Sequence, residues 1–133
     1  MGQIFSSLSN LISLNYLDLS SYQVSYSIPF SFGNLTQPAY LYLYNSFVRS
    51  LNPSFLSWLG KLSKLTYLGF QGIYLTMWIP SFLKNLTQLS FLGMGSNQMM
   101  DQIPSWLANL TQLTMLSLSY NKLQGPKIGR AHV

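Results

Sequence analysis

The sequence predicts a solenoid, in which short repeated units stack side by side and share one apolar core. Ile-Pro pairs at Ile28–Pro29, Ile79–Pro80 and Ile103–Pro104, with two equivalent apolar pairs, mark five units that recur about every 24 residues, one spacing being slightly longer. Leucines also fall at fixed offsets within the units. A unit of this length cannot bury its own leucines, so at least three units have to stack.

Each unit is expected to begin with a turn and to continue into a strand. The Ile-Pro start is too short and too proline-led for a long helix, so we expect an extended segment followed by a 3-10 or single helical turn. Alternating leucines then predict a short strand with its leucines on one face. The five strands are expected to centre near Leu17–Leu19, Leu41–Leu43, Leu68–Phe70, Leu92–Met94 and Leu116–Leu118.

The segments that flank the strands contain residues with local roles. Asn97 and Asn121 follow their strands and are expected to satisfy backbone groups in the bend, while Gly125 and Pro126 break regular structure. Pro38 replaces a core leucine just before the second strand, where proline is compatible with the first residue of a strand but not with its interior.

Composition limits the classes of function. The 133 residues fit one domain, and only 7% of them are charged. There is no cysteine, which excludes disulfides and thiolate zinc sites. The formal charge of +5 is scattered, so no nucleic-acid partner is expected. No apolar stretch approaches the ~18 residues of a membrane span, so this chain is not expected to cross a membrane.

Catalysis is not expected either. The only carboxylates, Asp18 and Asp101, lie three units apart, which at ~4.8 Å per strand is at least about 14 Å. Paired glycosidase carboxylates lie about 5–9.5 Å apart. His132 is the only histidine, so no metal cluster can be assembled. We therefore predict that the chain is not an enzyme and needs no cofactor.

The units follow the pattern IPxxLxNLTxLxxLxLSxNxLxG, which resembles the plant extracellular type of leucine-rich repeat found in the ectodomains of receptor-like proteins and receptor-like kinases. The match extends from Gly2 to Pro126. The resemblance implies a right-handed superhelix with a concave, ligand-binding parallel sheet, a convex face of short helical turns, and a small extra sheet near the LxGxIP segments. Residues 1–126 are thus expected to form one domain of about five repeats that starts within a solenoid.

The last seven residues depart from this period. Position 127 should be isoleucine and position 128 proline, but the chain ends in Lys127–Val133. This tail resembles the in-frame translation of a sequencing-library adapter. We therefore expect residues 127–133 to be non-native and to contribute nothing to folding or binding.

The family resemblance also implies a function. It suggests a module that binds a peptide or protein ligand, with a co-receptor kinase as a further partner, in the perception of signals for defence or development. The parent protein would then lie at the plasma membrane, on its extracellular side. Two alternatives remain open, namely a secreted leucine-rich repeat inhibitor of cell-wall-degrading enzymes and a non-functional gene fragment.

The outward-facing positions of the strands are the candidate ligand site. Three tyrosines share one face of the second strand, and tyrosine offers a large contact area and a polar tip at low entropic cost. The predicted ligand-binding residues are Asp18, Tyr40, Tyr42, Tyr44, Asn45, Tyr67 and Gln71. Glycines at positions 69, 93 and 95 are expected to leave a shallow space beside them. The competing interpretation is that the aromatic side chains only cover the sheet.

Three Asn-Leu-Thr triplets, at Asn34, Asn85 and Asn109, are N-glycosylation acceptors in one repeat phase on the convex side. The triplet is also part of the repeat consensus, because its leucine is a core position. The two interpretations are compatible, and modification requires secretion.

Overall fold

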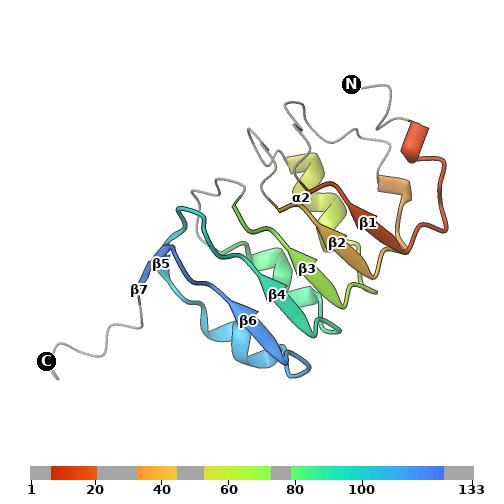
Figure 1. The fold of residues 1–133 in the computed structure, drawn as a ribbon. Helices are drawn as coiled ribbons and strands as arrows, with labels where there is room; N and C mark the ends of the chain where they lie inside the picture. Colours follow the sequence, from red (N-terminus) through yellow and green to blue (C-terminus); the bar gives the residue numbers. More distant parts are fainter. Residues whose placement is uncertain (1–6, 21–32, 45–52, 73–78, 125–133) are drawn as a thin grey trace, which may run out of the picture.

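The computed structural model describes residues 7–20, 33–44, 53–72 and 79–124, which form two parallel sheets and a row of helical segments (Figure 1). In chain order the elements are β1 (Tyr16–Asp18), β2 (Tyr40–Tyr42), α2 (Pro53–Gly60), β3 (Tyr67–Gly69), η2 (Ser81–Asn85), β4 (Phe91–Gly93), β5 (Met100–Gln102), η3 (Ser105–Asn109), β6 (Met115–Ser117) and β7 (Lys122–Gln124). The 3-10 segments η2 and η3 and the helix α2 lie on one side of the larger sheet.

The larger sheet has five parallel strands in the order β1-β2-β3-β4-β6, which confirms the predicted leucine-rich repeat solenoid. Each strand begins one residue before the first residue of its predicted range. The hydrogen bonds between neighbouring strands nevertheless continue to the last residues of the predicted ranges. The N–H groups of Leu19, Leu43 and Phe70, for example, donate to carbonyls of the next strand at 2.7–2.9 Å. The leucine register is continuous, because Leu17, Leu41, Leu68, Leu92 and Leu116 pair in sequence.

The helical row differs between repeats. In η2 and η3, an extended proline precedes five residues of 3-10 helix, with ψ of 133° at Pro80 and 141° at Pro104. The third unit instead forms the eight-residue α-helix α2, longer than the single turn that its sequence predicts. The chain from β2 to β3 is longer than between any other neighbouring strands of the sheet, and Pro53 occupies the first helical position, which proline favours. The additional chain length provides room for a second turn.

The core lies between the sheet and the helical row. It is built almost entirely from repeat leucines, many of which are fully buried, together with Phe70, Met94 and Trp58. Since α2 packs beside η2, and η2 beside η3, each unit completes the burial of its neighbours.

Asparagine side chains satisfy the backbone where the strands end, as the sequence predicts. Asn97 is buried and donates from Nδ2 to the carbonyls of Phe70, Met94 and Gly95 at 2.9, 3.0 and 3.2 Å. Asn121 repeats this pattern and also accepts the Met99 N–H at 3.0 Å. A bond from each asparagine to the preceding repeat helps to lock neighbouring repeats together.

Pro38 leaves a backbone acceptor without its usual donor. In other repeats, the leucine at this position donates its N–H to the carbonyl three residues earlier, as Leu65 does to Leu62 at 3.0 Å. Proline has no N–H, and here the indole Nε1 of Trp58 donates to the Leu35 carbonyl at 2.8 Å. A side chain from the following repeat thus supplies the missing donor.

The second sheet consists of β5 and β7, which pair in parallel with Asp101 opposite Leu123. It confirms the small extra sheet that the family resemblance implies. It lies to one side of the five-stranded sheet and leaves that sheet's outer face open (Figure 1).

Candidate functional site

The exposed face of the five-stranded sheet, opposite the helical row, is called here the concave face. Its first column is aromatic, because Tyr16, Tyr40, Tyr67 and Phe91 lie on successive strands in register. Their ring centroids are separated by 5.6, 5.1 and 5.7 Å. The repeat period therefore converts aromatic residues that lie one unit apart in the sequence into one continuous row of rings.

A second group of side chains lies on β1 and β2 and directly after β2. The ring of Tyr42 lies 5.7 Å from that of Tyr16 and 5.3 Å from that of Tyr44, with both pairs tilted by 47°. Asp18 pairs in register with Tyr42 and lies two residues after Tyr16 on the same strand. The four side chains Tyr16, Asp18, Tyr42 and Tyr44 are called here the tyrosine cluster.

Burial and neighbouring charges change the acidity of two cluster members. Desolvation, with smaller contributions from the surrounding phenols, raises the pKa of Tyr42 to about 12. Desolvation also raises the pKa of Tyr44, and the Asp18 carboxylate is the second cause. Both hydroxyls are therefore neutral hydrogen-bonding groups at physiological pH.

The prediction of a shallow space over the glycines is wrong, because aromatic rings and polar groups fill that space. A Cβ at position 69 would lie 2.6 Å from the Tyr44 ring, and one at position 93 would lie 2.8 Å from the Phe91 ring. At position 95 a Cβ would lie 3.1 Å from the Ser119 carbonyl oxygen. The glycines thus allow rings to lie down on the sheet, so that the face is closely covered rather than hollow.

The structure brings most of the predicted ligand-binding residues together on one face, because Tyr67 also lies against Tyr40. Asp18, Tyr40, Tyr42 and Tyr44 lie together on β1 and β2 or directly after them. The other three predicted residues are placed as follows: Tyr67 stacks on Phe91, Gln71 lies over Gly93, and Asn45 is outside the described residues.

Tyr16 is absent from the predicted set, although it contacts two of its members. Its side chain is 55% exposed, and its ring lies against those of Tyr40 and Tyr42. The signal was available in the sequence, since Tyr16 occupies the same repeat position as Tyr40 and Tyr67.

The glycosylation triplets lie away from the concave face. Asn85 and Asn109 are the last residues of η2 and η3, and both side chains are exposed. Asn34 is exposed as well, while the middle leucine of each triplet is buried. The acceptor amides are accessible, as glycosylation requires. Glycosylation of the three asparagines stays a prediction.

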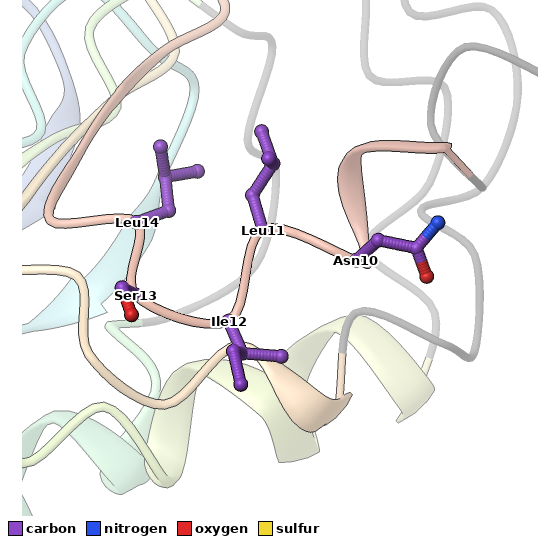
Figure 2. A pocket seen from close by; sticks show the side chains of 5 residues that line it. All are labelled: Asn10, Leu11, Ile12, Ser13 and Leu14. Atoms are coloured by element: carbon purple, nitrogen blue, oxygen red, sulfur yellow. The ribbon is translucent and has the colours of Figure 1, made fainter.

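A shallow pocket of about 360 Å³ lies on the segment that precedes β1. Asn10, Leu11, Ile12, Ser13 and Leu14 line it (Figure 2). The apolar Leu11 and Ile12 are exposed, and Figure 2 shows their side chains pointing in different directions. All lining residues come from one local segment, so the pocket brings no distant groups together.

Within the described ranges, no group of three or more His, Cys, Asp or Glu side chains could hold a metal ion. Within the same ranges, no helix is both long and apolar enough to span a membrane.

Comparison with known proteins points to one family. A family model described as Leucine Rich Repeat matches residues 13–35. A TDR receptor structure is 30% identical with a TM-score of 0.70, and the match covers 87% of this chain and 20% of the receptor. Among curated protein sequences, none matches significantly.

Two further structures are similar. The Arabidopsis receptor kinase HAESA, in complex with the peptide hormone IDA and the co-receptor SERK1, is 28% identical with a TM-score of 0.69, over 89% of this chain and 20% of HAESA. A plant ice-binding protein is 25% identical with a TM-score of 0.63, over 84% of this chain and 35% of that one. This chain thus spans about a fifth of the two receptors. The in-phase repeats, the parallel sheet and these likenesses identify the chain as a leucine-rich repeat solenoid that resembles plant receptor ectodomains.

Proposed function

We propose that this chain is a non-catalytic recognition module of a plant cell-surface receptor-like protein, and that its concave face binds a peptide or protein ligand. The observation that carries the proposal is the aromatic row together with the tyrosine cluster. Tyrosine is enriched in binding surfaces, because one rigid ring provides both apolar area and a hydrogen-bonding tip. HAESA, a similar protein, is described in complex with a peptide hormone and a co-receptor.

The shape of the face favours an extended ligand. Tyr16 lies on β1, Tyr42 on β2 and Gln71 two residues after β3, so at ~4.8 Å per strand their backbones span about 10 Å across the sheet. Because rings cover the glycines, the surface offers stacking and hydrogen bonding rather than a deep cavity. A peptide or protein loop fits such a surface better than a small buried cofactor.

The remaining parts of the proposal follow from the family. We propose an extracellular location at the plasma membrane, a co-receptor kinase as second partner, and a role in defence or development. N-glycans on Asn34, Asn85 or Asn109 would extend from the side opposite the ligand, since Asn85 and Asn109 end η2 and η3 and Asn34 has the same position in its repeat. They would therefore leave the concave face accessible.

The test uses the chain produced through the secretory pathway and a phage-displayed library of random peptides. Selected peptides are synthesised, and their affinities for wild type and variants are measured by calorimetry. One anchor that costs ~2 kcal/mol on truncation corresponds to about a 30-fold loss of affinity. The Tyr42→Ala/Tyr44→Ala double variant should therefore lose between about 30-fold, the cost of one anchor, and about 700-fold, if the two costs add. Lys84→Ala, on η2, should leave affinity unchanged.

Secretion yield and circular dichroism are recorded for each variant, so that misfolding is not mistaken for lost contact. If the selected peptides bind the double variant as tightly as wild type, the tyrosine cluster is not part of the binding site. These tyrosines would then only cover the sheet.

A further inference from the structure

The rings of the tyrosine cluster are arranged differently from those of the adjacent aromatic pair. The planes of Tyr67 and Phe91 are only 12° apart, with ring centroids 5.7 Å apart, so these two rings are nearly parallel. The Tyr16–Tyr42 and Tyr42–Tyr44 pairs are tilted by 47° at 5.7 and 5.3 Å. Tilted neighbours do not cover each other's faces fully, so part of the negative π-surface is open to a third group.

A carboxylate lies among these rings. Asp18 is exposed and is flanked by Tyr16 on its own strand and by Tyr42 on the next. Its Oδ1 accepts the Ser20 N–H at 2.8 Å, which holds the carboxylate in place on the sheet. Asp18 also influences Tyr44, because its negative charge contributes to the raised pKa of that phenol.

The local charge is opposite to the charge of the whole chain. The formal net charge is +5, yet none of the four lysines in the described ranges belongs to the five-stranded sheet. Lys64 lies three residues before β3, and its Nζ donates to the Gln37 side chain at 2.6 Å. Three π-faces and one carboxylate therefore form a negative region without a cation from the described part of the chain.

We propose that the tyrosine cluster is a cation-binding subsite that takes an arginine side chain of the peptide ligand. This inference rests on the proposed function, and it specifies the chemistry of the ligand. Guanidinium groups stack on aromatic faces and pair with carboxylates through a planar fork, which matches tilted tyrosine rings beside Asp18. A lysine ammonium fits less well, because it is more strongly hydrated and lacks that plane.

A neutral oligosaccharide also stacks on aromatic rings, but it leaves the charge of Asp18 uncompensated. The test separates these ligands with three probes, namely acetyl-Gly-Arg-Gly-amide, acetyl-Gly-citrulline-Gly-amide and cellotetraose. Citrulline has nearly the shape of arginine without its charge. Binding is followed through the ring proton resonances of the full chain labelled with ¹³C-tyrosine.

The arginine peptide should bind at least tenfold more tightly than the citrulline peptide and more tightly than cellotetraose. Asp18→Asn should reduce arginine-peptide affinity about fivefold, and Tyr16→Leu should reduce it by a similar factor. Tyr42→Phe should retain binding, because the ring face and not the hydroxyl contacts the cation. Tyr120→Leu is the matched control, since Tyr120 is an exposed tyrosine on the loop after β6.

Equal affinities for the arginine and citrulline peptides would overturn the proposal, and so would tighter binding of cellotetraose. Tyr16 is largely exposed, so its truncation should not unfold the chain, and each variant's ring spectrum checks this point. The two proposals fail separately. Library peptides that depend on Tyr42 and Tyr44 while arginine and citrulline bind alike would retain the ligand site and reject the cation subsite.

Discussion

Replacing Trp58 by phenylalanine should destabilise the chain more than its loss of apolar area predicts. The indole Nε1 donates to the Leu35 carbonyl at 2.8 Å, and Trp58 is only 2% exposed. Phenylalanine keeps an aromatic ring but has no donor. Pro38 cannot provide the N–H that leucine provides in other repeats, so the Leu35 carbonyl would be left without this partner.

The expected magnitude follows from this unpaired acceptor. A buried polar group that loses its partner costs about 1–3 kcal/mol, beyond the cavity term of the smaller ring. A leucine at position 38 would restore the backbone donor. The cost of Trp58→Phe should therefore be lower in a Pro38→Leu background by at least about 1 kcal/mol, which is a coupling expected only of interacting sites.

The assay is a double-mutant cycle in urea, with unfolding free energies measured by far-ultraviolet circular dichroism. Trp106→Phe is the matched control, because Trp106 occupies the same repeat position two units later. Its cost should be the same with proline or leucine at position 38, since distant sites are additive. If Trp58→Phe also costs the same in both backgrounds, the indole does not replace the missing backbone donor, and the reasoning is wrong.

Three further predictions concern other repeats and the concave face. Asn97→Ala should lower the free energy of unfolding by about 2–3 kcal/mol in the same urea assay, because three buried carbonyls lose a donor. The isosteric Asn97→Asp replaces the donating amide by an oxygen and should lower it by at least as much. Gly69→Ala should lower the free energy of unfolding by about 1–3 kcal/mol, because the added Cβ would meet the Tyr44 ring at 2.6 Å. A Tyr44→Ser background should remove most of this cost. Gly60→Ala is the tolerated control, since its Cβ would lie 3.7 Å from the nearest neighbour. Tyr42 should titrate near pH 12 in absorbance at 295 nm, above the ordinary value of 10.0. Its neutral form is favoured in the folded state, so this contribution to stability is complete below pH 10 and is lost as pH rises through about 12, and Tyr42→Phe should remove that part of the pH dependence.

Much of the architecture is determined by spacing alone. A leucine that recurs at the same position of every unit can be buried only if successive units align, so the period predicts the strand order, the inward leucines and the aromatic column. The roles of Asn97 and Asn121 are equally local, because each side chain binds carbonyls within three residues as well as one in the preceding repeat. These features depend on short-range geometry that every unit repeats.

Other features depend on contacts between units, which the sequence pattern does not encode. The period places Gly69 beside Tyr42, but only packing decides that the Tyr44 ring lies over Gly69 and closes the expected space. Similarly, Pro38 signals a lost donor, yet only the fold brings Trp58 to the Leu35 carbonyl. The sequence repeat determines which positions face each other, whereas the orientation of large side chains at those positions is decided by the volume that neighbouring repeats leave available.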